Sequence, residues 1–365
     1  MKLFSSYPLG DIELNNRLVM SPMTRCRAIG NTASPLMAEY YRQRANAGLI
    51  VTEGTSPSPN GLGYARIPGL FKQEQAKDWK QVTDAVHKVG GKIYIQLMHT
   101  GRVSHQINMP EGAVVLAPSA VPFSGDMWTD EKGLLPCSEP RAMSAEEVET
   151  TIGEYVQSSK LAIEAGFDGV ELHSANGYLA NQFLDPATNH RQDDYGGSLK
   201  KRNRFVLEVA KAVTQAIGAT KTGIRLSPHG SFNDMSEYPE LTEQYGLLAT
   251  GLGALHLAYL HMVDHSAIGQ AKPLAATIEK VCTNFRSAGG GAIILSGGYE
   301  KQRAEADLQS GAADLIAFGR PFISNPDLVE RLRLDAALAT PDDSSFYIAG
   351  EEGYTDYPTL KEGVK

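Results

Sequence analysis

Cysteine and long apolar runs are scarce in this sequence of 365 residues. Its three cysteines, Cys26, Cys137 and Cys282, are an odd number, lie far apart and form no Cys-x-x-Cys pair. A disulfide framework and a zinc site are therefore both disfavoured, and we expect no bound metal. No stretch approaches the roughly 18 consecutive apolar residues of a membrane-spanning helix, so no transmembrane segment is expected.

Positive charge is also in short supply. The formal net charge is −8 and there is no run of Lys or Arg, so the basic footprint of a nucleic-acid-binding protein is absent. Residues 1–8 contain no apolar run long enough for a signal peptide. We therefore expect a cytoplasmic protein that binds neither nucleic acid nor membrane. Its hydrophobic content of 42% is ordinary for a globular chain with a large core.

Apolar strand-like runs alternate with helical patterns along the chain, which is typical of βα units around a parallel sheet. The expected strands are residues 18–20, 49–52, 92–97, 169–172, 222–226, 257–261, 292–295 and 315–318. The expected helices are residues 35–47, 73–89, 145–165, 199–217, 241–251, 273–285, 301–309 and 327–338. Ser144 and Glu147 predict a capping box at the start of the third helix. The repeated pairs predict an α/β fold, a single closed (β/α)8 TIM barrel.

One interval, residues 100–143, interrupts this alternation. It is rich in Pro, Gly and Ser, lacks helical periodicity, and contains a turn at residues 130–133 between extended runs. A structureless loop of that length would be unusual inside a compact domain. We therefore expect a β-hairpin that caps the barrel mouth after strand three. The whole chain, residues 1–365, is expected to be one domain with 100–143 as its capping insertion.

The most informative segment is residues 167–179, where an apolar run stops at His173. Asn176 and Tyr178 follow on a Gly-containing turn. Strands of an α/β barrel place reactive groups at their C-terminal ends in this way. His173 and Asn176 are suited to donate to one substrate oxygen, with Tyr178 as a proton donor, which indicates chemistry on a polarised carbonyl. The alternative is that these side chains only fix a loop.

The other strand ends indicate a cofactor. Gly298 follows strand seven, and Gly319 with Arg320 follows strand eight, where barrels often build a phosphate site. Gln96 ends strand three and Arg225 ends strand five. A phosphate site, an amide and a guanidinium together suit the flat phosphorylated cofactor FMN, whose reduced ring carries negative charge near N1. Alternatively, Gln96 is a satisfied core amide and Arg225 part of a salt bridge at the barrel mouth.

The sequence resembles the Old Yellow Enzyme family of FMN-dependent ene-reductases over essentially its full length. The motifs that carry the resemblance are residues 20–25, 36–41, 96–97, 173–178, 189–191, 194–198, 317–320 and 353–358. The order His-x-x-Asn-x-Tyr followed by Tyr-Gly-Gly-Ser is highly specific. Thr24, where other members carry Cys, places the chain closest to the bacterial branch of N-ethylmaleimide and nitrate-ester reductases.

The resemblance implies roles around the barrel mouth. The cofactor-binding residues would be Pro22, Met23, Thr24, Gly54, Gln96, Arg225, Gly298, Gly319 and Arg320. The substrate-binding residues would be His173, Asn176, Tyr64, Met98 and Tyr347. The catalytic residues would be Tyr178, His173 and Asn176.

Met98 departs from the family pattern, which usually has Trp after the Gln-Leu pair. Because Met is smaller and more flexible, we expect a looser pocket wall, and substrate preferences cannot be carried over from the family. Packing beneath the cap is the plain alternative for Met98, and also for Tyr64 and Tyr347. Cys26, close to Thr24, is treated as structural.

The resemblance implies an FMN-dependent NAD(P)H oxidoreductase that reduces activated C=C bonds of α,β-unsaturated carbonyls, maleimides and nitroalkenes. It favours NADPH over NADH and a monomer or homodimer acting on a small electrophilic alkene. Reduction of nitrate esters or nitroaromatics as the main role, and a non-catalytic flavin-binding protein, remain as alternatives. A flavin-free barrel lyase or aldolase is a weaker rival, because no suitable Lys or metal cluster follows the strands.

Overall fold

A closed barrel of eight parallel strands forms the centre of the computed structural model, which describes residues 1–266, 269 and 272–361. Each barrel strand pairs with the next along the chain, and β14 pairs with β3 to close the circle. The strands are β3 (Leu18–Met20), β4 (Leu49–Thr55), β5 (Ile93–Leu97), β10 (Gly169–Ser174), β11 (Thr222–Leu226), β12 (Tyr259–Val263), β13 (Ala292–Ser296) and β14 (Leu315–Phe318). The predicted (β/α)8 TIM barrel is confirmed.

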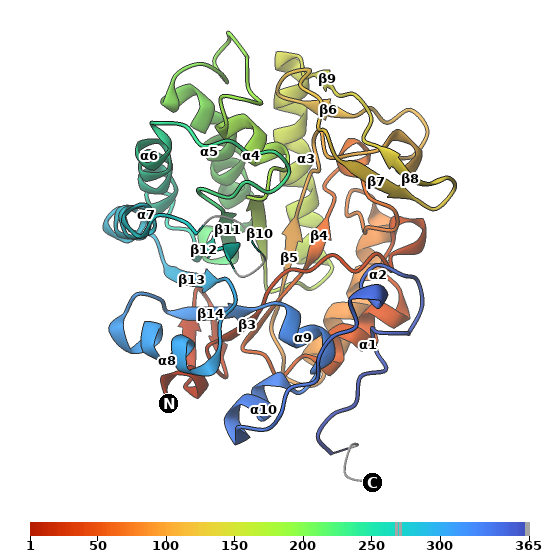
Figure 1. The fold of residues 1–365 in the computed structure, drawn as a ribbon, viewed down its shortest axis with the longest axis vertical. Helices are drawn as coiled ribbons and strands as arrows, with labels where there is room; N and C mark the ends of the chain where they lie inside the picture. Colours follow the sequence, from red (N-terminus) through yellow and green to blue (C-terminus); the bar gives the residue numbers. More distant parts are fainter. Residues whose placement is uncertain (267–268, 270–271, 362–365) are drawn as a thin grey trace.

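Helices surround the strands on the outside of the barrel (Figure 1). Those that follow the barrel strands are α1 (Pro35–Gln43), α2 (Gln73–His87), α3 (Ala145–Glu164), α5 (Leu199–Ile217), α6 (Leu241–Gly253), α7 (Ala275–Ser287), α8 (Lys301–Ser310) and α10 (Leu328–Leu334). Two further short helices, α4 (Leu179–Leu184) and α9 (Arg320–Ser324), come directly after β10 and β14. Within the described ranges, no helix is long and apolar enough to cross a membrane.

Several predicted element boundaries were wrong by a few residues. β12 begins at Tyr259 and not at 257, because Leu257 still accepts a backbone hydrogen bond from Gly291 outside the regular ladder. The apolar run in the sequence continues from Leu257 into the strand, so it does not mark where the strand begins. α7 begins at Ala275 and not at 273, since Leu274 has an extended backbone. α10 ends at Leu334 and not at 338, because Asp335 turns into the left-handed region at φ 53°.

The barrel interior is mainly apolar toward its N-terminal end. The hairpin of β1 (Tyr7–Leu9) and β2 (Ile12–Leu14) closes that end and adds Leu9 and Leu14 to the interior cluster. Two glycines, Gly169 and Gly223, make room there for the rings of Tyr94 and Tyr259. A Cβ on Gly223 would lie 2.2 Å from Cζ of Tyr259. The inward positions nearer the mouth are left to polar residues.

The segment between β5 and α3 forms the expected β-hairpin cap. β7 (Asp126–Thr129) pairs antiparallel with β8 (Gly133–Pro136), and β6 (Leu116–Ala117) pairs with β9 (Arg141–Ala142) at its base. The hairpin projects at one side of the barrel (Figure 1). Apolar cap residues such as Val103 and Met127 pack in one cluster with Met98 and Tyr178. The cap therefore makes part of the roof over the barrel mouth.

Candidate active site

A cleft of about 270 Å³ opens at the C-terminal ends of the barrel strands. Its walls come from the segment after β3, from β4, β5, β10 and β11, and from the segments after β14 and near the C-terminus. The lining residues are Pro22, Met23, Thr24, Arg25, Gly54, Gln96, Met98, His173, Asn176, Tyr178, Arg225, Phe232, Arg320, Ile323, Phe346 and Tyr347. Most of the residues predicted from the sequence therefore lie around one cleft.

Three larger hollows lie outside this mouth. One of about 700 Å³ lies beside residues 355–359, one of about 640 Å³ lies between α7 and α8, and one of about 460 Å³ lies between residues 29–31 and the cap hairpin. None of the three contains the predicted His, Asn and Tyr side chains. Among the described residues there is also no cluster of His, Cys, Asp or Glu of the kind that holds a metal. The predicted His, Asn and Tyr side chains converge in the smaller cleft.

His173 and Arg225 are paired neighbours on β10 and β11. Both are buried, and neither His173 Nδ1 nor Arg225 Nε has a hydrogen-bond partner within the described structure. Burial, together with the charge of Arg225, lowers the pKa of His173 well below its ordinary value. The imidazole is therefore neutral and donates through its single N–H group. No acidic side chain of the described residues lies within ion-pair distance of Arg225; the alternative of a salt bridge at the mouth is not what the structure shows.

Asn176 is held from three directions. Its backbone N–H donates to Ser227 Oγ at 2.8 Å, and its carbonyl accepts from Asn233 Nδ2 at 2.8 Å. Its side-chain Oδ1 lies 2.7 Å from His265 Nε2. With Oδ1 occupied by His265, the amide nitrogen is left to donate into the cleft. The residue has φ 61°, a left-handed conformation that Asn tolerates better than most residues.

Tyr178 and Tyr64 meet through their hydroxyl oxygens, 2.9 Å apart. Burial raises the pKa of Tyr178 to about 12, while the hydrogen bond with Tyr64 lowers it in part. Tyr178 therefore keeps its proton at neutral pH. Tyr64 does not line the cleft itself but supports Tyr178 from behind. Burial also raises the pKa of the nearby Cys26 thiol to about 12, so this cysteine is not a thiolate at neutral pH.

Gln96, Gly54 and Met98 line the cleft from two adjacent strands. Gln96 Nε2 donates to Glu171 Oε1 at 2.8 Å, so its amide is fixed but its oxygen is not used in that bond. A Cβ on Gly54 would lie 2.6 Å from Sδ of Met98. The glycine therefore allows the methionine to pack directly against β4, which makes Met98 part of the cleft wall.

The predicted phosphate-binding residues lie at the rim. Ser296 of β13 pairs with Ala317 of β14, so the segments that contain Gly298 and Gly319 leave the barrel from neighbouring positions. Gly298 has φ 57°, in the left-handed region. Arg320 is exposed and lines the cleft, whereas the two glycines are not part of its lining.

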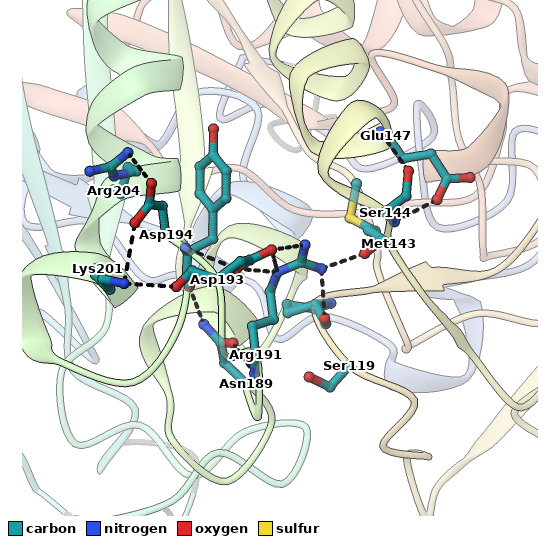
Figure 2. Close-up of polar contacts among 12 residues, drawn as sticks. Ser119, Met143, Ser144, Glu147, Asn189, Arg191, Asp193, Asp194, Lys201 and Arg204 are labelled. Atoms are coloured by element: carbon teal, nitrogen blue, oxygen red, sulfur yellow. Dashed lines mark hydrogen bonds and ion pairs between the residues drawn. The ribbon is translucent and has the colours of Figure 1, made fainter.

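The Asn189–Ser198 motif lies away from the cleft, and Figure 2 shows what its side chains contact. The guanidinium of Arg191 donates to the carbonyl oxygens of Pro118 and Met143, at 3.1 and 2.5 Å, and pairs with Asp193. Asn189 Nδ2 bonds the carbonyl of Tyr195. The motif thus holds the chain after β10 against the residues that follow β6 and β9 at the base of the cap, which is a structural role.

The sequence analysis missed several residues that line the cleft or contact its lining from below. Phe232 and Phe346 line the cleft, but they stand in irregular segments whose pattern carries no signal. Glu171 had a signal, because alternation along β10 puts it on the same barrel face as His173. His261 on β12 and His265 just after it became apparent only through their contacts.

A parallel barrel whose strand ends converge on one polar cleft defines the class of α/β-barrel enzymes. Residues 2–338 match the model of the NADH:flavin oxidoreductase / NADH oxidase family. The chain belongs to this family.

Individual relatives match this chain over nearly its full length. 12-Oxophytodienoate reductase 7 of Oryza sativa subsp. japonica is 42% identical, covering 98% of this chain and 94% of its own. The solved structure of morphinone reductase superposes with a TM-score of 0.94 at 42% identity, covering 100% and 97% of the two chains. The Old Yellow Enzyme homologue of Zymomonas mobilis gives 0.92 at 36% identity, covering 99% and 100%. The resemblance to the Old Yellow Enzyme family is confirmed, and the protein is a flavin oxidoreductase.

Proposed function

We propose that this protein is an FMN-dependent NAD(P)H oxidoreductase that reduces activated C=C bonds of α,β-unsaturated carbonyls, maleimides and nitroalkenes. The observation that carries the proposal is the pair of unpartnered buried atoms, His173 Nδ1 and Arg225 Nε, beside Tyr178. Buried polar groups without a partner are rare in folded proteins. A cofactor and a substrate that both present acceptor atoms would satisfy them.

The residues fit an FMN ring laid across the mouth. Gln96 and Arg225 would hold the pyrimidine edge, with Thr24 at O4. Pro22, Met23 and Gly54 would border the ring, and Gly298, Gly319 and Arg320 would hold the phosphate. The chemistry that FMN supplies when bound is hydride transfer, from the nicotinamide nucleotide to the β-carbon of the substrate.

On the substrate side, His173 and Asn176 would each donate a hydrogen bond to the carbonyl or nitro oxygen. Their donation stabilises the negative charge that develops on this oxygen, as in an oxyanion hole. Tyr178 would protonate the α-carbon as general acid, because its high pKa keeps the proton bound until it is needed. Met98 and Tyr347 would border the substrate, and the exposed Tyr347 leaves that side open.

An ultraviolet–visible spectrum of the purified protein tests the proposal. We expect flavin bands near roughly 450 nm that bleach with NADPH and return when cyclohexenone is added. A colourless protein that releases no FMN on denaturation would contradict it. A flavin that bleaches but is reoxidised by none of the alkenes would favour the non-catalytic or nitrate-ester alternative.

The same proposal covers the nicotinamide nucleotide that reduces the flavin, the oligomeric state and the cellular location. The resemblance favours NADPH, but a morphinone reductase structure holds tetrahydroNAD, so steady-state assays with both nucleotides decide between them. We infer that residues 1–365 act as one FMN-binding domain with 100–143 as its cap, in the cytoplasm, as a monomer or homodimer. Nitrate-ester or nitroaromatic reduction is the second candidate and enters the same substrate panel.

A further inference from the structure

A row of polar side chains crosses the barrel interior one layer below the cleft. Glu171 Oε1 accepts from Gln96 Nε2 at 2.8 Å, and Glu171 Oε2 lies 2.9 Å from His261 Nδ1. His261 Nε2 then lies 3.1 Å from Ser296 Oγ. The row runs through β5, β10, β12 and β13, and both Glu171 and His261 are fully buried.

A buried row of polar side chains is not explained by its contribution to the stability of the fold. Barrel interiors are usually filled with branched apolar side chains, as by Val51 of β4 and Ile294 of β13 here. A buried ionised group costs several kcal/mol unless it is well paired, and apolar replacements are often as stable. The row lies directly beneath Gln96 and Arg225, which line the cleft. This position indicates that the row has a role in the site.

The charges in the row can be assigned from its contacts. Burial raises the pKa of Glu171, but His261, Arg225 and the bond from Gln96 together hold it below its ordinary value. Burial lowers the pKa of His261, with Glu171 opposing that effect. Glu171 is thus an anion that accepts from a neutral His261, and it is a counter-charge for the otherwise unpaired Arg225.

We propose that Glu171, held in place by His261, is a positioning residue for the FMN site: it orients the Gln96 amide and offsets the charge of Arg225. This inference rests on the proposed function. With one N–H of Gln96 committed to Glu171, the amide presents its oxygen and second N–H to the mouth. The carboxylate also reduces the positive field beneath the pyrimidine edge. Affinity for FMN and the flavin potential should therefore both depend on a residue that lies below the cleft.

The Glu171→Gln variant removes the charge with little change of shape. Its oxygen can still accept from Gln96, and its amide nitrogen can donate to His261 Nδ1 once the imidazole proton moves to Nε2, which faces Ser296 Oγ. We expect FMN to remain bound and its midpoint potential to rise, since uncompensated Arg225 favours the negatively charged reduced ring. Arg225→Ala should shift the potential in the opposite direction, and the double variant should return toward wild type. The matched control is Asp185→Asn, a buried carboxylate that bonds Ser236 outside the barrel and should leave the potential unchanged.

The Glu171→Asp variant tests whether the hydrogen bond to Gln96 matters, because the shorter side chain keeps the charge but withdraws the carboxylate from Gln96. For refolded apoprotein with wild-type circular dichroism, we expect the FMN dissociation constant to rise about tenfold, the effect of one buried hydrogen bond. This measurement carries the inference if Glu171→Gln does not fold. An unchanged potential in Glu171→Gln, or unchanged affinity in Glu171→Asp, would overturn it. Absence of FMN from the wild-type protein would instead overturn the proposed function.

Discussion

Tyr178 is the residue whose proposed role is most easily separated from the rest of the site. Tyr178→Phe removes one hydroxyl and nearly preserves the shape, so FMN content and reduction by NADPH should stay near wild type. Protonation of the α-carbon should slow by roughly 10²–10⁴-fold, as is typical of a lost general acid. Stopped-flow reoxidation with cyclohexenone measures this loss.

Nitroalkenes are the internal control for this variant, because a nitronate is stable enough to leave before it is protonated. Flavin reoxidation by a nitroalkene should therefore suffer less. Tyr64→Phe is the matched variant. It keeps Tyr178 but removes the hydrogen bond that lowers the pKa of Tyr178, so its effect should be smaller. Near-wild-type turnover of cyclohexenone by Tyr178→Phe would mean that another group supplies the proton.

His173 and Asn176 are proposed to bind the substrate oxygen together. Replacing both by Ala should raise KM and slow the oxidative half-reaction, at about 2.7–4 kcal/mol for one such donor. FMN content should remain near wild type, because neither side chain is assigned to the cofactor. Steady-state and stopped-flow kinetics with cyclohexenone measure both effects. A double variant with the normal rate would show that these side chains only fix the loop.

Glu53 should make stability depend on pH. It is buried within β4, and burial raises its pKa from 4.5 to about 7, although the bond from Arg25 N opposes the shift. The folded protein therefore holds a proton that the unfolded chain releases between pH 4.5 and about 7. Because the folded pKa is the higher one, this contribution to stability is lost as pH rises through that window.

Glu53→Gln removes this titration. Relative to wild type, the variant should gain stability between pH 5 and pH 8, by an amount on the order of 3 kcal/mol at most. Urea unfolding at both pH values, at the same FMN concentration, measures the gain. An equal difference between the two proteins at pH 5 and pH 8 would show that Glu53 does not titrate in this range.

At the scale of elements, the start of α3 carries a local signal that the structure bears out. Glu147 N donates to Ser144 Oγ at 3.1 Å, and Ser144 N donates to Glu147 Oε2 at 2.8 Å, which is the predicted capping box. Ser144→Ala should lower the free energy of unfolding by about 1 kcal/mol. Urea unfolding measures the loss. Ser198→Ala is the matched control, because Ser198 stands at the same position of α5 but its side chain makes no capping bond. Equal losses in the two variants would contradict the assignment.

At the scale of the whole molecule, the C-terminal segment is fastened to the barrel through Tyr354. Its fully buried ring stacks on Tyr40, with ring centroids 4.0 Å apart, and its carbonyl accepts from the guanidinium of Arg44. The same segment contributes Phe346 and Tyr347 to the cleft. A distant packing contact therefore supports one wall of the site.

Tyr354→Ala should lower the free energy of unfolding by about 3–5 kcal/mol, the usual cost of truncating a buried aromatic side chain. It should also weaken retention of FMN, because the cleft wall loses its anchor. Thermal unfolding and flavin content of the purified variant measure these effects. Tyr354→Phe is the control and should be close to neutral, since the Tyr354 hydroxyl has no hydrogen-bond partner in the described structure.

The barrel and most of the cleft could be predicted from the order of the amino acids. Alternating apolar runs and helical patterns are properties of each segment, so β3, β11 and β14 were predicted with their observed bounds. Residues at strand ends, such as His173 and Arg225, meet because parallel strands bring their carboxyl ends to one side of the sheet. That geometry follows from the fold class alone.

The contacts that hold these residues in place could not be predicted in this way. Tyr64 and Tyr178 are 114 positions apart, Asn176 and His265 are 89 apart, and Glu171 and His261 are 90 apart. Each contact depends on closure of the barrel and on the path of a loop, which no local pattern records. The ends of helices such as α10 were mispredicted for a related reason. One backbone angle, at Asp335, stops the helix, and its value is set by surrounding contacts that short-range periodicity does not contain.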